Sequence, residues 1–314
     1  MRIAIFGAGA VGAYVGGRLA QAGQQVALIA RGEHLDALRH HGLRVESPHG
    51  DFVIQPWLAT DDPAQVGVVD AVVVGVKTWQ LSEVADALSP LVGPQTSIVP
   101  LQNGVEAPTQ LARTVGPQHI LGGCCWIMSG LVTPGHIHHR GGIDPYLVFG
   151  EMDNRRSARV DDLHRVFIQA GITAAIAEDI QVAMWEKLVQ TAAFSGIGAL
   201  TRAPVGILCR LPETRALLVQ VMEEVAAVAR ARHIALPDDI VTTAMAQLER
   251  FPPGGTNSTQ RDLIAGRPSE LEAHSGAVVR LGQEVGVPTA LNTFVYHSLL
   301  PQERRARGQL EFPS

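Results

Sequence analysis

The sequence is poor in aromatic residues, and no single sign of charge dominates it. Aromatic residues make up 5% of the 314 positions, whereas hydrophobic residues as a whole make up 46%. The cores must therefore be rich in Ala, Val, Leu and Ile, as is usual where helices pack on a buried parallel sheet. A chain of 314 residues exceeds the usual length of one domain. We therefore expect two domains of the α/β class.

The near balance of charge and the scarcity of cysteine argue against several kinds of partner. A formal net charge of -5 offers no basic face to nucleic acid or anionic lipid, and we interpret the RRAR run at 304–307 as a solvated tail. The 3 cysteines form neither a disulfide framework nor a zinc spacing, which fits a reducing cytoplasm. No stretch reaches about 18 uninterrupted apolar residues, and no small-residue cleavage site follows the apolar N-terminus, so we expect neither membrane insertion nor export.

The first thirty or so residues have the pattern of a strand, a glycine turn, a helix and a second strand. The strands are expected at 2–6 and 25–30 and the helix at 12–22. Such a βαβ unit almost always makes a right-handed crossover in a parallel sheet. The turn carries the motif G-x-G-x-x-G, formed by Gly7, Ala8, Gly9, Ala10, Val11 and Gly12. In this context the motif predicts close backbone approach to a dinucleotide pyrophosphate at the helix N-terminus.

Later apolar runs extend this pattern and then give way to helices. Strands are expected at 70–76 and 97–100, and an antiparallel or mixed sheet edge at 122–151. After Glu178 helices are expected, separated by Pro or Gly, at 179–200, 213–233, 237–250, 257–265 and 269–286. We therefore predict an N-terminal Rossmann-type doubly wound sheet over 1–178 and an all-helical C-terminal domain over 179–314.

The residue that follows the second strand indicates which dinucleotide is bound. An NAD enzyme usually carries Asp or Glu there for the ribose hydroxyls, whereas this chain carries Arg31. A guanidinium offers a fixed fork of donors and a permanent charge, which suit a 2′-phosphate. The sequence therefore predicts NADP(H), although a solvated arginine after a strand is the other interpretation.

Several strings, in order along both domains, resemble ketopantoate reductases. They are GAGAVGAYVGGRLA, the lysine in VKTWQ, LQNGVE, WEKLV and NSTQRDLIAGRPSELEA. The resemblance implies NADPH-dependent reduction of 2-dehydropantoate (ketopantoate) to pantoate, a step of pantothenate biosynthesis, by a cytoplasmic enzyme. It leaves a homodimer open as the assembly.

The resemblance also implies which residues are catalytic. Lys187 matches the family's lysine that hydrogen-bonds the substrate ketone, and a positioned lysine in its apolar stretch AMWEKLVQTAAF can hand a proton to a developing alkoxide. Without the resemblance, a surface lysine paired with Glu186 or Glu178 would be favoured. Glu270 matches the active-site glutamate, expected to bond the substrate hydroxyl or steady Lys187, unless it only stabilises the first turn of a helix.

Thr191 and Ser195 follow Lys187 at helical steps of four, so the three polar groups share a face that we expect to meet the substrate. The family usually carries asparagines at both positions. Because a hydroxyl is shorter than an amide, either water fills the gap or the preferred 2-oxo acid is bulkier or less polar than ketopantoate. Close helix packing beside Gly196 is the alternative role for Ser195.

The remaining predicted site residues follow strands or begin a helix. Asn257 and Ser258 leave a Pro/Gly loop, and backbone N–H groups beside Ser258 could bind the substrate carboxylate. Simple capping of the helix is the other interpretation, and it can coexist with this role. Lys77 and Asn103 follow strands at whose carboxyl ends ligands bind. By resemblance both border the nicotinamide ribose and the substrate.

No metal site is expected, because the histidines 136, 138 and 139 lack carboxylate or cysteine partners in the sequence. Two other functions stay open beside reduction of ketopantoate. One is reduction of another branched 2-oxo or 3-oxo acid on the same scaffold, motivated by Thr191 and Ser195. The other is a non-catalytic NADP(H)-binding regulator, against which the joint presence of Lys187 and Glu270 argues.

Overall fold

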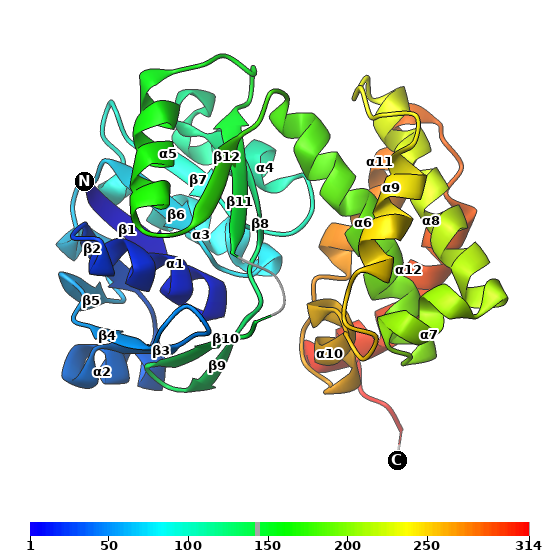
Figure 1. Ribbon diagram of the computed structural model, residues 1–314, viewed down its shortest axis with the longest axis horizontal. Coiled ribbons are helices and arrows are strands. Elements are labelled where there is room, and N and C mark those ends of the chain that lie inside the picture. The colour runs from blue at the N-terminus through cyan, green and yellow to red at the C-terminus, as the bar shows by residue number, and fades with distance from the viewer. Residues whose placement is uncertain (142–144, 314) are drawn as a thin grey trace. The chain divides into compact units, whose positions relative to one another are not determined.

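A computed structural model describes residues 1–141 and 145–313, whose helices and strands are labelled in Figure 1. The chain divides into two compact units. The first comprises Met1–Gln102 and Ala107–Ile180, and the second comprises Asn103–Glu106 and the chain from Gln181 onward. The short segment Asn103–Glu106 thus joins the second unit, although our division at 178 placed it in the first. No helix among the described residues has the length and apolar character needed to span a bilayer.

A five-stranded parallel sheet forms the centre of the first unit. Its strands, in the spatial order β5-β2-β1-β6-β7, are β5 (Leu58–Thr60), β2 (Gln25–Ile29), β1 (Arg2–Phe6), β6 (Ala71–Val74) and β7 (Ser97–Pro100). All the pairings are parallel. Because the chain leaves β1 towards β2 and later returns to β6 on the other side of β1, the strand order reverses beside β1. Ligands of α/β enzymes bind at such a point, at the carboxyl ends of the strands. The predicted Rossmann-type fold is confirmed.

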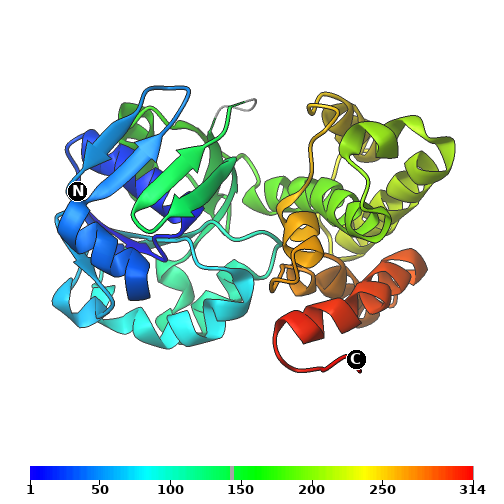
Figure 2. The ribbon, with the colours of Figure 1, turned by 90° about the horizontal axis from the view of Figure 1, so that it is seen from below.

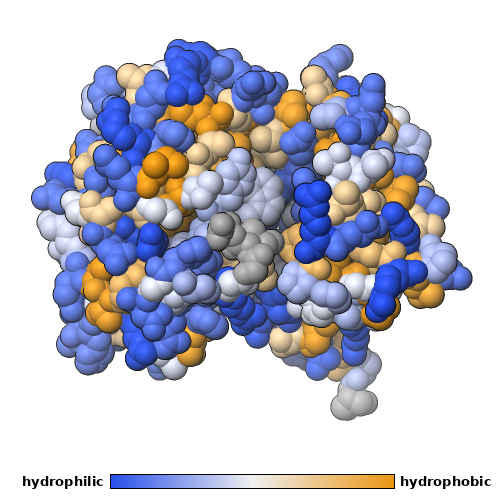
Figure 3. Space-filling model, viewed as in Figure 1, coloured by the Kyte–Doolittle hydropathy of each residue, from blue (hydrophilic) through white to orange (hydrophobic). Residues whose placement is uncertain are grey.

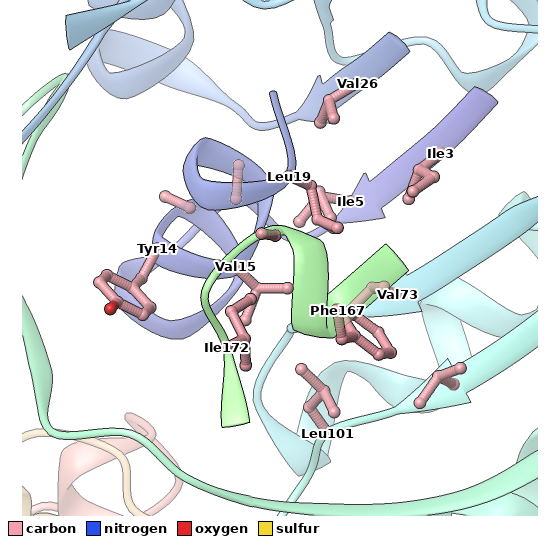
Figure 4. Close-up of a cluster of buried hydrophobic side chains, with 14 of the residues drawn as sticks. Ile3, Ile5, Tyr14, Val15, Leu19, Val26, Val73, Leu101, Phe167 and Ile172 are labelled. Carbon is pink, nitrogen blue, oxygen red and sulfur yellow. The ribbon is translucent and has the colours of Figure 1, made fainter. Parts of the chain in front are cut away.

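Helices cover both faces of this sheet. Figure 4 shows one face, where side chains such as Ile5 of β1, Leu19 of α1 (Ala10–Gln21) and Phe167 of α5 (Ala158–Gln169) form a buried cluster. The alternate residues of the same strands, Phe6 among them, pack with α3 (Leu81–Ala87) and α4 (Ala107–Val115). A strand buried on both faces is apolar along its whole length, which explains the continuous apolar runs in the sequence.

Two smaller sheets complete the first unit. One holds β8 (Leu121–Trp126), β11 (Tyr146–Glu151) and β12 (Thr173–Ile176), with β11 antiparallel to β8 and parallel to β12. The other has the order β4-β3-β10-β9 and contains β4 (Phe52–Ile54), β3 (Leu43–Glu46), β10 (His136–His139) and β9 (Ser129–Thr133). The mixed sheet expected over 122–151 is therefore confirmed. The sequence did not predict β3, β4, β5 and β12, nor the helices α2 (Gly32–His41) and α5.

The second unit is helical. The predicted helices correspond to α6 (Ile180–Thr201), α8 (Pro212–Ala231), α9 (Ile240–Glu249), α10 (Ser258–Ile264) and α11 (Ala277–Val285), and a π-helix over Glu272–Gly276 leads into α11. Two further helices, α7 (Val205–Arg210) and α12 (Ala290–Ala306), were not predicted. Figure 2 shows α12, in red, beside the π-helix and α11.

The end of α12 corrects one expectation from the sequence. Glu303 is 1% exposed, and its carboxylate accepts hydrogen bonds from the backbone N–H of Ser269 at 3.1 Å and from Nε of Arg307 at 2.7 Å. A buried carboxylate needs such charged and polar partners. The interpretation of RRAR as a solvated tail is therefore wrong for Arg307.

The surface mixes polar and apolar residues. On the face shown in Figure 3, hydrophilic and hydrophobic residues alternate over each unit. The large hydrophobic side chains that are exposed, such as Val53, Leu131 and Phe294, come from different elements. Scattered apolar side chains of this kind are normal at a protein surface.

Candidate active site

The glycine motif forms the turn between β1 and α1. Gly7 has φ +94°, and a Cβ atom there would lie 2.5 Å from Cγ1 of Val76, so only glycine fits. A Cβ atom on Gly12 would lie 2.2 Å from the carbonyl oxygen of Gly7. Gly9, the N-cap residue of α1, would instead place its Cβ atom in open space. The backbone is thus closely packed at Gly7 and Gly12, whereas space is open beside Gly9 at the N-terminus of α1. These residues fit a dinucleotide pyrophosphate.

Arg31 and Lys77 follow the two strands that flank β1. Arg31 comes after β2, is the N-cap residue of α2 and is exposed. Lys77 comes after β6, and its ammonium lies 5.7 Å from the centre of the Trp79 ring. Since carboxyl ends of parallel strands meet at one edge of a sheet, the fold brings both residues to the edge that carries the glycine loop.

Three of the predicted site residues are joined by hydrogen bonds in the second unit. Nζ of Lys187 donates to Oδ1 of Asn103 at 2.9 Å, and Nδ2 of Asn103 donates to Oε2 of Glu270 at 2.7 Å. Lys187 is 7% exposed and Glu270 is 4% exposed. Buried charges require partners, and one amide offers an acceptor to the ammonium and a donor to the carboxylate. The interpretation of Lys187 as a surface lysine is therefore wrong.

Asn103 reaches these charges because its segment is held against the helices. Gly104 has φ +88°, and a Cβ atom there would lie 2.7 Å from the carbonyl oxygen of Ala273. Glu106, two residues on, forms an ion pair of 2.6 Å with Arg280 of α11. The glycine of the LQNGVE string thus permits a close approach of Asn103–Glu106 to the π-helix. This explains why the segment belongs to the second unit.

The hydroxyls of Thr191 and Ser195 bond within the helical unit. Oγ1 of Thr191 donates to the carbonyl oxygen of Lys187 at 2.9 Å. Ser195 is 1% exposed, and its Oγ lies 3.1 Å from Nδ1 of His274, a buried residue of the π-helix. Nδ1 of His274 also lies 3.4 Å from Oγ1 of Thr259. The structure therefore places the Ser195 hydroxyl against His274 instead of on an open face.

The neighbourhood of Ser195 is also closely packed. A Cβ atom on Gly196 would lie 2.5 Å from Cγ1 of Val295 on α12, so glycine lets the two helices approach. This agrees with the packing alternative for Ser195. The sequence analysis did not predict His274, whose only signal is its position four residues after Glu270, about one helical turn.

Asn257 and Ser258 begin α10. Oδ1 of Asn257 accepts hydrogen bonds from the backbone N–H groups of Thr259 at 2.8 Å and Gln260 at 3.4 Å. Ser258 is the first residue of the helix. Asn257 therefore caps this helix start, as the capping interpretation expects. Capping can coexist with a contact to the substrate, which stays a prediction.

Two of the three histidines of β10 contact residues of β3 and the loop that follows it. Nε2 of His136 lies 3.2 Å from Oε1 of Glu46, and Nδ1 of His139 lies 2.9 Å from Oγ of Ser47. Within residues 1–141 and 145–313, no group of His, Cys, Asp or Glu side chains is arranged to hold a metal ion.

Comparison with known proteins identifies the family. The model for "Ketopantoate reductase PanE/ApbA" matches residues 3–154, and that for "Ketopantoate reductase PanE/ApbA C terminal" matches residues 179–303. A 2-dehydropantoate 2-reductase of Nostoc sp. is 32% identical, with 100% of this chain and 99% of the relative covered. One of Mesorhizobium japonicum is 31% identical, with 92% of this chain and 94% of the relative covered.

Solved structures agree with this assignment. A PanE/ApbA family ketopantoate reductase from Ralstonia eutropha superposes with a TM-score of 0.89 at 32% identity, covering 98% of this chain and 100% of that one. A D-mandelate dehydrogenase solved with NADH and anilino(oxo)acetate also reaches 0.89, but at 23% identity this second likeness shows the fold alone. The two family models, the relatives and the sheet order agree, and the chain belongs to the ketopantoate reductase family of oxidoreductases.

Proposed function

We propose that this protein reduces 2-dehydropantoate to pantoate with NADPH. The proposal rests mainly on two hydrogen bonds, from Lys187 to Asn103 and from Asn103 to Glu270. They connect a buried ammonium to a buried carboxylate. A group that must donate a proton to a ketone oxygen has to be fixed in place. These hydrogen bonds fix Nζ of Lys187.

The first unit supports the choice of cofactor. The open space before Gly9 receives the pyrophosphate at the N-terminus of α1, and Arg31 pairs with the 2′-phosphate. Lys77, at the same edge of the sheet, borders the nicotinamide ribose. When bound, the nicotinamide supplies the hydride that adds to the keto carbon.

Residues of the second unit stabilise the negative charge that develops on the keto oxygen. Nζ of Lys187 donates a hydrogen bond to the keto oxygen and transfers its proton as the alkoxide forms. Asn103 holds the ammonium in position through its Oδ1 atom and holds Glu270 through its Nδ2 atom. Glu270 balances the charge of Lys187 and accepts a hydrogen bond from the substrate hydroxyl.

A second candidate is the reduction of another branched 2-oxo acid. It is favoured by the pair Thr191 and Ser195, because the Ser195 hydroxyl contacts His274 and the Thr191 hydroxyl donates to the backbone. Such a site recognises a substrate hydroxyl less strictly than one with two amides. Contacts of Asn257 and Ser258 with the substrate, a cytoplasmic location and a homodimer all stay predictions.

The test is NADPH oxidation, followed by its absorbance, with 2-dehydropantoate and a panel of branched 2-oxo and 3-oxo acids. We expect the highest kcat/KM for 2-dehydropantoate. A higher value for another acid would replace the substrate in this proposal. A protein that binds NADPH but oxidises it with no acid of the panel would instead be a regulator.

A further inference from the structure

A histidine with no part in the proposed chemistry bonds the glycine loop. His34 lies in the first turn of α2 and is partly buried. Its Nε2 atom lies 2.7 Å from the carbonyl oxygen of Ala8. Its Nδ1 atom lies 2.9 Å from the backbone nitrogen of Gly135, in the turn between β9 and β10. One imidazole thus joins the loop to a turn more than a hundred residues away, within the first unit.

These two contacts define the form of the imidazole. A carbonyl oxygen only accepts, so Nε2 carries the hydrogen, and a backbone N–H only donates, so Nδ1 presents its lone pair. The neutral ring with its proton on Nε2 makes both bonds. Burial lowers the pKa of His34 below its ordinary value, and the hydrogen bond to Ala8 opposes this effect only in part. The electrostatics therefore favour the same neutral form.

The Ala8 carbonyl controls the direction of a donor in the cofactor loop. Because the peptide bond is planar and trans, the carbonyl of Ala8 and the N–H of Gly9 point in opposite directions. The N–H groups of Gly7 and Ala8 both donate to the carbonyl oxygen of Ile29, at 3.1 and 2.9 Å. His34 holds the following peptide plane through the Ala8 carbonyl oxygen. The Gly9 N–H is thereby held at the start of α1, where helix N–H groups bind anions.

We infer that His34 is a positioning residue for the cofactor pyrophosphate. Through Ala8 it sets the direction of the Gly9 N–H, and through Gly135 it ties the loop to the β9–β10 turn. This inference rests on the proposed binding of NADPH. Since His34 acts on the loop and not on the reacting atoms, its loss raises the Kd and the KM for NADPH while kcat changes little.

Two amide substitutions separate the bonds of the ring. In His34→Gln the side-chain N–H₂ group takes the place of Nε2–H and keeps the donor to Ala8. In His34→Asn the amide oxygen takes the place of Nδ1 and keeps the acceptor for Gly135, but the donor to Ala8 is lost. A matched control is His40→Asn, because His40 lies on the same helix and is exposed, and its described contacts, with the Asp36 carbonyl and the His41 ring, stay within that helix.

The measurement is the Kd for NADPH by fluorescence titration, with steady-state kinetics and Tm for each variant. We expect His34→Asn to weaken NADPH binding about tenfold, the scale of one hydrogen bond, and His34→Gln by no more than about threefold. His40→Asn should match the unmodified protein. Equal loss of affinity in the Gln and Asn variants, or none in His34→Asn, would overturn the inference alone. Failure of the unmodified protein to bind NADPH would overturn the proposed function as well.

Discussion

Replacing Lys187 by methionine removes the buried ammonium while keeping an unbranched side chain in α6. We expect turnover to fall by roughly 10²-fold to 10⁴-fold, the range over which a positioned proton donor contributes to a rate. Cofactor affinity should change little, because the residues to which we assign the cofactor, the glycine loop and Arg31, are unchanged. A variant with near-normal turnover would exclude Lys187 as the proton donor.

The structure also predicts how Lys187 and Glu270 depend on each other. Asn103 bonds both charges, at 2.9 and 2.7 Å, and a hydrogen bond to a charged group contributes about 1.5 to 3 kcal/mol. Lys187→Met removes the donor to Oδ1 of Asn103, and Glu270→Gln replaces the charged acceptor of the Nδ2 hydrogen bond by a neutral one, so each change weakens the hold on the remaining charge. The effects of Lys187→Met and Glu270→Gln should therefore overlap by about 1.5 to 3 kcal/mol in the double variant.

Single-turnover stopped-flow measurement of NADPH absorbance gives the rate of the chemical step in all the proteins. The rate of the double variant should exceed the rate expected from multiplying the two single losses by about 10-fold to 150-fold, the equivalent of that overlap. If the two rate losses multiply in full, Lys187 and Glu270 act independently and the role assigned to Asn103 is wrong. Intact secondary structure by circular dichroism is the control for each variant.

Three further predictions concern cofactor choice, substrate choice and pH. Arg31→Ala should reduce the ratio of the Kd for NADH to the Kd for NADPH by about tenfold. This is the lower end of the range for a charge-assisted hydrogen bond, because Arg31 is exposed. Equal Kd values for the two cofactors in the unmodified protein would refute this prediction. The double variant Thr191→Asn, Ser195→Asn should raise the ratio of kcat/KM for 2-dehydropantoate to kcat/KM for 2-oxo-3,3-dimethylbutanoate. Thr191→Asn should give most of this gain, because Ser195 contacts His274. Discrimination of roughly 10⁴-fold between the two acids in the unmodified enzyme would contradict this prediction. Burial lowers the pKa of His34 below its ordinary 6.5, so below pH 6.5 the unfolded state begins to bind a proton before the folded state does. The contribution of His34 to the free energy of unfolding should therefore be complete above pH 6.5 and fall as the pH drops below it. His34→Gln should flatten that fall in denaturant titrations, and an unchanged slope would contradict this prediction.

The sequence predicted features that depend on local pattern. The glycine loop, β1, α1 and β2 follow from a few adjacent residues whose backbone needs are specific, as the φ of +94° at Gly7 shows. By contrast, α12 contains Pro301, and two of the four residues on its buried face are polar, Asn292 and Glu303, so neither its apolar periodicity nor its ends were evident. The buried carboxylate of Glu303 on this helix accepts a hydrogen bond from Ser269, in a loop distant in sequence.

The sequence identified residues of the candidate site, but it did not predict the contacts between them. Lys187 and Glu270 were identified by resemblance, but the bridging amide of Asn103 depends on a four-residue segment joining the helical unit. The contact between Ser195 and His274 joins residues far apart in the chain, and helical spacing alone suggested an open face for Ser195. His34 carried no signal in sequence, because both its partners are backbone atoms.

The proposed reduction of 2-dehydropantoate is tested most directly by identifying the product formed when the purified protein, NADPH and 2-dehydropantoate are combined. NADPH consumption by absorbance and product identity by NMR are measured in the same samples. We expect pantoate to appear mole for mole with NADP⁺, and we expect Lys187→Met to abolish most of this conversion while still binding NADPH. Binding of NADPH without formation of pantoate would contradict it.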